Sequence, residues 1–170
     1  MKLNLLPLFS FIFMLNLCAC SEVECPLDSV VVMTCGLYDA DTKEKLNLEQ
    51  TLTVKPMGKD TVFLNAAIDM SDFVLPLKYA ETTDSMLFHF SDRWGQTVTD
   101  TLVVCHDNIQ HFESVECPTV VFHQLISVDW ANENTTAAAS FLTIDSVAIV
   151  RKLVDYADVE NIQIYLRSAR

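Results

Sequence analysis

The sequence predicts an all-β fold: a single antiparallel β-sandwich of about nine short strands, in an Ig-like or related Greek-key arrangement. Apolar and polar residues alternate with a period of two in several segments, which is typical of strands with one buried face. Turn-forming runs such as Asp-Arg-Trp-Gly-Gln at 92–96 separate the segments at a spacing of about 8–12 residues, as in sandwiches and barrels. No segment carries a convincing amphipathic helix pattern.

Each expected strand has its own signal. Strict alternation predicts strands at 46–55, 73–77, 86–90 and 162–167. In the last of these, Ile162, Ile164 and Leu166 fall on one face. Runs rich in β-branched and aromatic residues predict further strands at 30–38, 61–64, 98–105, 120–130 and 143–150.

Residues 1–19 have the character of a bacterial lipoprotein signal peptide. Lys2 is followed by a largely apolar run at 3–17, which is short for a membrane span and typical of an exported protein. The run ends in Leu-Cys-Ala-Cys at 17–20, which resembles the lipobox. The resemblance implies cleavage before Cys20 and lipidation of Cys20 with diacylglycerol and an acyl chain such as palmitate. An ordinary signal-peptidase site, with Cys20 free or paired, is the alternative.

Cleavage at this site defines three regions: a signal peptide at 1–19, a lipidated anchor and short tether at 20–27, and a β-sandwich domain at 28–170. The chain has 11 basic and 23 acidic residues and a net charge of −12. This acidic balance argues against nucleic-acid binding, which needs clustered Lys and Arg, and against adsorption to anionic lipid. We therefore expect an acidic exported domain, held at the membrane by its lipid.

Five sequence blocks carry a family resemblance. They lie at 24–31, 99–104, 111–125, 143–150 and 160–167 and include the motifs ECPLDSVV, HFESVECPTVVFHQL and TIDSVAIV. Together they resemble a family of small Bacteroidetes lipoproteins of unknown function. The resemblance covers nearly the whole domain, supports an envelope location and implies no reaction.

Four cysteines remain after the predicted cleavage: Cys25, Cys35, Cys105 and Cys117. An oxidising compartment allows two disulfides among them. Cys25 and Cys117 each precede a proline at the start of a predicted strand, and both belong to the blocks that resemble the family, so we expect a Cys25–Cys117 disulfide. Cys35 and Cys105 then remain to form the second disulfide, although the alternation of side chains places them on poorly matched strand faces. A Cys25–Cys35 disulfide is the alternative pairing.

No residue pattern indicates catalysis or a cofactor. Gly36, Gly58 and Gly95 lie too far apart for a nucleophile elbow or a phosphate-binding loop. His106 and His123, like the other two histidines, lack the close spacing of zinc ligands. We expect neither an enzyme nor a bound metal or other cofactor.

Five Asp-Ser/Thr-apolar tripeptides resemble the O-glycosylation sequon of exported Bacteroidetes proteins. Their hydroxyl residues are Ser29, Thr61, Ser85, Thr101 and Ser146. The same tripeptide also suits a turn that leads into a strand, because Asp, Ser and Thr favour turns and an apolar β-former then starts the strand. Both interpretations stay open.

The function that these features favour is a lipid-anchored cell-envelope protein with a non-catalytic interaction or structural role. We expect it at the outer membrane, facing the periplasm or the cell surface, with the membrane and an outer-membrane protein as partners. The alternative is an accessory lipoprotein that captures a glycan or peptide. This alternative depends on four aromatic residues near turns or strand ends, where their rings can stack on sugars: Trp94, Trp130, Tyr38 and Tyr79.

Overall fold

The structure is a computed structural model that describes residues 25, 31–132 and 141–168. The described residues form ten strands and no helix. The strands are β1 (Val32–Asp39), β2 (Thr51–Pro56), β3 (Leu64–Ala67), β4 (Asp72–Pro76), β5 (Thr83–Ser91), β6 (Thr97–His111), β7 (Val120–Asn132), β8 (Leu142–Ile149), β9 (Leu153–Val154) and β10 (Ile162–Ser168).

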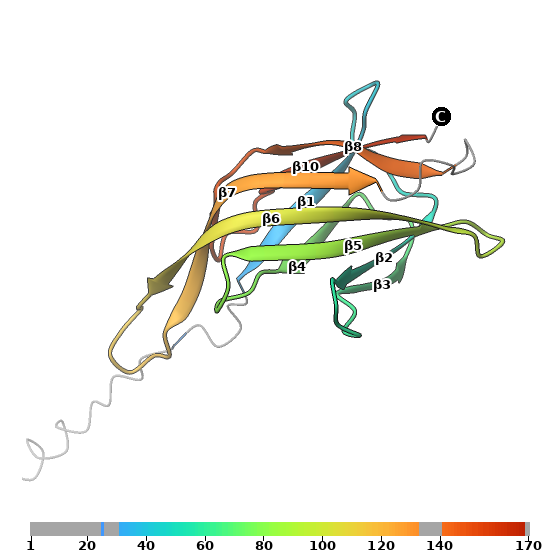
Figure 1. The fold of residues 1–170 in the computed structure, drawn as a ribbon. Helices are drawn as coiled ribbons and strands as arrows, with labels where there is room; N and C mark the ends of the chain where they lie inside the picture. Colours follow the sequence, from blue (N-terminus) through green and yellow to red (C-terminus); the bar gives the residue numbers. More distant parts are fainter. Residues whose placement is uncertain (1–24, 26–30, 133–140, 169–170) are drawn as a thin grey trace, which may run out of the picture.

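The strands form two sheets that pack against each other (Figure 1). The smaller sheet has the order β4-β1-β10-β8, and the larger sheet, β3-β2-β5-β6-β7-β9, curls around it. Alternate residues of both sheets are buried between them, as the alternation predicted. Phe73 of β4 meets Phe88 of β5 edge-on across this core, with 6.1 Å between ring centroids. The all-β class and the two-sheet architecture are confirmed.

Two details differ from the expected antiparallel sandwich of about nine strands. β1 and β10 pair in parallel, from Cys35 opposite Ile162 to Asp39 opposite Leu166. A parallel pair needs a long crossover connection, and the eight intervening strands supply it. A tenth strand, β9, pairs with His123 and Gln124 of β7. Two residues are too few to show an alternating pattern, so this strand had no signal in the sequence.

The β6–β7 hairpin extends further than expected and projects beyond the two sheets (Figure 1). A register shift between Cys105 and His106 marks a bulge in this pair. Near the turn of the hairpin, the His111 ring stacks on Phe122 at 4.3 Å, and Tyr156 packs edge-on against Phe122 at 5.0 Å. These aromatic contacts support the projecting part of the hairpin.

The expected disulfide joins Cys25 to Cys117, with 5.5 Å between their Cα atoms. Cys117 lies in the turn of the β6–β7 hairpin, between His111 and Val120. The cross-link spans 92 residues of sequence. It therefore holds Cys25 against the end of the hairpin.

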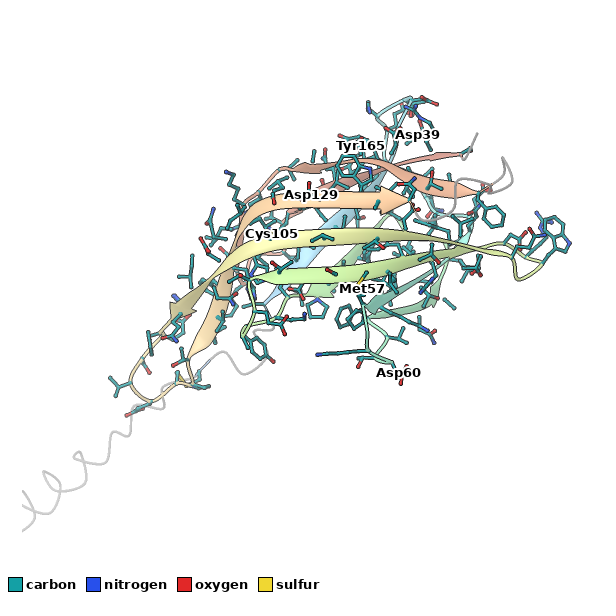
Figure 2. All side chains as sticks on the ribbon, viewed as in Figure 1. Asp39, Met57, Asp60, Cys105, Asp129 and Tyr165 are labelled. Atoms are coloured by element: carbon teal, nitrogen blue, oxygen red, sulfur yellow. A yellow bond between two sulfur atoms is a disulfide. The ribbon has the colours of Figure 1, made fainter. Side chains whose placement is uncertain are left out.

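The expected Cys35–Cys105 pairing is wrong, because both residues are free thiols. Cys35 belongs to β1 in the smaller sheet, where it is fully buried in the core with Met33 and Leu37. Cys105 belongs to β6 in the larger sheet, at a position between the buried Val104 and His106 (Figure 2). It therefore faces away from the core, and two thiols on opposite sides of a sheet do not meet. Burial raises the pKa of Cys35 well above its usual value.

The predicted signal peptide (1–19), the lipidation residue Cys20 and nearly all of the 20–27 tether lie outside the described residues. Nowhere in the described part of the chain is there a helix with the length and apolarity needed to cross a bilayer.

Candidate functional site

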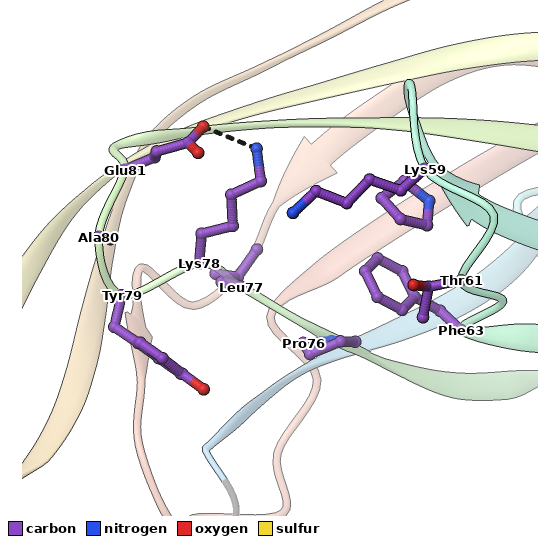
Figure 3. A pocket seen from close by; sticks show the side chains of 10 residues that line it. Lys59, Thr61, Phe63, Pro76, Leu77, Lys78, Tyr79, Ala80 and Glu81 are labelled. Atoms are coloured by element: carbon purple, nitrogen blue, oxygen red, sulfur yellow. Dashed lines mark hydrogen bonds and ion pairs between the residues drawn. The ribbon is translucent and has the colours of Figure 1, made fainter.

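A half-open pocket of about 350 Å³ lies between the loop after β2 and the loop after β4 (Figure 3). Its apolar lining comes from Pro56, Phe63, Pro76 and Leu77. The two prolines are the last residues of β2 and β4, where a residue without an N–H ends the ladder. The strand ends thus place rigid apolar surface at the start of both loops.

Two lysines supply positive charge to the pocket. In Figure 3 the amines of Lys59 and Lys78 lie on the same side of the pocket, near Glu81. Lys78 Nζ is 2.7 Å from Glu81 Oε2. A hydrogen bond with Glu81 raises the pKa of Lys78, while Lys78, and then Lys59, lower the pKa of Glu81. Both shifts favour the charged forms. Tyr79, which is 75% exposed, points away from the amines.

The 77–82 loop that carries Lys78 and Tyr79 is fixed to the strands behind it. Three hydrogen bonds join it to strand residues: Lys78 N donates to Asp84 Oδ2 (3.0 Å), His106 N donates to Thr82 O (2.9 Å) and Asn108 Nδ2 donates to Glu81 O (2.8 Å). Bonds at both ends of the loop hold its backbone in place. The pocket wall is therefore formed before any ligand binds.

A buried polar network supplies these bonds. His106 Nε2 lies 3.0 Å from Asp84 Oδ2, and both residues are almost completely buried. His123 packs edge-on against His106 at 4.8 Å, and its Nδ1 is 2.7 Å from Asn108 Oδ1. Burial, and then the neighbouring His106, lower the pKa of His123 to about 4. Because His106, Asp84 and His123 are buried, we assign the network to positioning the loop rather than to contacting a ligand.

This network was missed in the sequence, although a signal for it existed. Alternation along β6 puts His106 on the same face as Leu102 and Val104, which belong to the core. A histidine on a core face needs a polar partner, and Asp84 in the neighbouring strand supplies it. In the described part of the chain, no group of three or more His, Cys, Asp or Glu side chains could hold a metal ion.

The aromatic residues considered for sugar stacking do not gather in one place. Tyr79 lies at the pocket, whereas Trp94, also 75% exposed, lines a second hollow of about 390 Å³ at the β5–β6 turn. The pocket and the second hollow lie at opposite ends of β5, whose nine residues span about 30 Å. Tyr38 lies in the smaller sheet, with 5.6 Å between its ring centroid and that of Tyr165. Trp130 is 37% exposed on β7.

The predicted O-glycosylation residues differ in their surroundings. Ser29 lies outside the described residues. Thr61 is exposed in the loop that borders the pocket, whereas Ser85 and Ser146 are half-buried in β5 and β8, and Thr101 is buried in β6. Glycosylation stays a prediction, and exposure favours Thr61.

Residues 51–166, from the start of β2 into β10, match the model of a family of unknown function (DUF6452). The match spans more than half of the chain, so the protein belongs to this family. Neither a curated protein nor a solved structure matches the chain. Membership confirms the expected relationship to an uncharacterised family, while the envelope location stays a prediction.

Proposed function

We propose that this protein is a lipid-anchored lipoprotein of a Bacteroidetes cell envelope, with a non-catalytic interaction or structural role. The Cys25–Cys117 disulfide is the observation that carries the proposal. Structural disulfides persist in exported proteins and are rare in the cytosol. The lipobox-like residues 17–20 lie just before Cys25 and supply the anchor.

The proposed location is the outer membrane, with the domain facing the periplasm or the cell surface. The proposed protein partner is an outer-membrane protein, because a domain tethered by a short segment meets mostly neighbours in the same membrane. We also retain an Ig-like or related Greek-key arrangement as the finer fold proposal. Its support is that the chain crosses repeatedly between the two sheets along its length.

Two cysteine substitutions test the anchor. Cys20→Ala should abolish incorporation of labelled palmitate and leave a precursor or a soluble protein, because acylation requires that thiol. Cys18→Ala is the matched control, since this residue belongs to the predicted signal peptide and should leave labelling intact. Mass spectrometry should find the mature N-terminus at Cys20 with its lipid. A mature N-terminus at another residue, or an unmodified Cys20, would contradict the proposal.

A second candidate function is the capture of an acidic glycan or peptide in the pocket between the β2 and β4 loops. The observation that favours it is the pair Lys59 and Lys78 beside an apolar lining in a chain of net charge −12. A carboxylate that meets two ammonium groups while an apolar body covers Phe63 would satisfy both parts of the pocket.

Titration with short acidic peptides and with uronic-acid oligosaccharides separates the two ligand classes. Lys59→Gln should weaken binding about tenfold if a charged contact is lost from the pocket. Lys152→Gln removes an exposed charge outside the pocket and should leave the affinity unchanged. Equal effects of the two variants, or no binding of either ligand class, would exclude this candidate.

A further inference from the structure

The turn of the β6–β7 hairpin exposes apolar side chains at the end that is cross-linked to Cys25. Val115 is fully exposed and Phe112 is 65% exposed. Hydrogen bonds from Cys117 N to Ser114 O (3.3 Å) and from Glu116 N to Ser114 Oγ (3.2 Å) give this turn a defined shape. The exposure of Phe112 and Val115 is thus a property of an ordered turn.

The proposed lipid lies close to this turn along the chain. Cys20 precedes Cys25 by five residues, and five extended residues span at most about 18 Å. The disulfide adds 5.5 Å between the Cα atoms of Cys25 and Cys117. The lipid-bearing residue therefore lies within about 24 Å of Cys117, which is less than the thickness of one bilayer.

We propose that the hairpin turn inserts into the interfacial region of the bilayer that holds the anchor, with Phe112 and Val115 as the inserting side chains. This inference rests on the proposed lipidation of Cys20. The disulfide keeps the turn near the lipid headgroups, and apolar side chains held there leave water by entering the boundary between headgroups and acyl chains. Phe is among the residues that interfacial segments bury at this boundary.

Charge determines which lipid surface fits. Glu113 lies between Phe112 and Val115, and Glu116 follows Val115. Glu113 Oε1 is 3.0 Å from His111 Nε2. The whole chain is also strongly acidic. An anionic surface would repel the turn, so the occupant we assign is a bilayer of net-neutral lipids, such as phosphatidylcholine or phosphatidylethanolamine.

Insertion would orient the domain. β6 has 15 residues and runs about 45–50 Å from the β5–β6 turn to the hairpin turn. Figure 1 shows these two turns at opposite ends of the molecule. Trp94 and its hollow would then face away from the bilayer, with the Lys59–Lys78 pocket between the two ends.

Fluorescence quenching tests the inserted position. The full lipidated protein carries Trp94→Phe, Trp130→Phe and Phe112→Trp, so that position 112 holds its single tryptophan, and is reconstituted into phosphatidylcholine vesicles with brominated acyl chains. Since interfacial segments lie about 5–10 Å into the headgroup boundary, fluorescence from position 112 should fall about twofold. The Trp130→Phe protein, which keeps Trp94, should show no change. Val115→Trp replaces Phe112→Trp as the reporter if the exchange at 112 disturbs the hairpin.

The disulfide gives a second test. Adding Cys25→Ser and Cys117→Ser to the position-112 reporter should reduce the quenching, because the turn is no longer held near the lipid. Vesicle flotation separates the two proposals. Protein that floats without quenching at 112 or 115 overturns the insertion and leaves the anchor standing. A turn covered by a protein partner would give this same result. Full-length protein that is mixed with the vesicles and does not float with them overturns the anchor and the insertion together.

Discussion

Removal of the Cys25–Cys117 disulfide should destabilise the domain by about 4.6 kcal/mol at 25 °C. The cross-link closes a loop of 92 residues. For a loop of that length, the chain-entropy treatment assigns a loss of about 16 cal/mol/K to the unfolded chain, which corresponds to this free energy. Cys25 and Cys117 lie outside the strands and are half-buried, so the double substitution removes less packing than a change in the core. The expected effect therefore comes mainly from the unfolded state.

Urea unfolding of non-lipidated protein, followed by fluorescence, measures this effect. The double variant Cys25→Ser with Cys117→Ser should unfold about 2 M earlier than the oxidised protein, if the slope is about 2 kcal/mol/M. The reduced wild-type protein should match the double variant. Cys105→Ser is the control, because its thiol is free and half-exposed and lies 3.9 Å from the Thr83 hydroxyl, which a serine can still meet.

Equal midpoints for the oxidised protein and the double variant would refute the reasoning. They would mean that the loop is not closed in solution, or that the unfolded chain is already compact around these residues. A large loss in the Cys105→Ser control would instead indicate that Cys105 has a covalent partner.

Three further predictions concern buried residues. Because the pKa of His123 falls from 6.5 to about 4 on folding, the stability that depends on its neutral ring is complete above pH 6.5 and declines towards pH 4. Between pH 7 and 5 the free energy of unfolding, measured by urea titration, should fall by about 2 kcal/mol. His123→Gln should flatten this pH dependence, and the control His111→Gln should keep it. Gly36→Ala should cost about 1–3 kcal/mol, since the added methyl group would collide with the Tyr38 ring and with the Glu160 carboxylate, which Tyr38 and Gln163 hold by hydrogen bonds. Glu160→Ala in the same chain should recover part of that loss. Phe88→Ala should lower the free energy of unfolding by about 3–5 kcal/mol by opening a cavity between the sheets; a loss below about 1 kcal/mol would contradict its fully buried position.

Local pattern was sufficient to predict most of the strands, because a strand with one buried face repeats its burial every second residue. It was insufficient for the pairing of β1 with β10, since parallel contact between strands far apart in sequence depends on how the whole chain wraps. The pocket was missed for the same reason. Lys59 and Lys78 belong to different loops, and only the placement of β2 and β4 in separate sheets brings those loops to one pocket.

The cysteines show which disulfide pairings sequence position alone can predict. Cys25 and Cys117 lie outside strands, in segments that are free to approach each other, and their shared context before a proline indicated the correct pair. Cys35 and Cys105 lie inside strands, where the sheet fixes the direction of each side chain. Once the structure assigns them to different sheets, one facing the core and the other facing outward, an oxidising compartment is not enough to join them. The buried Cys35 thus behaves as a small apolar core residue, and the half-exposed Cys105 is the thiol that a maleimide reagent should reach first.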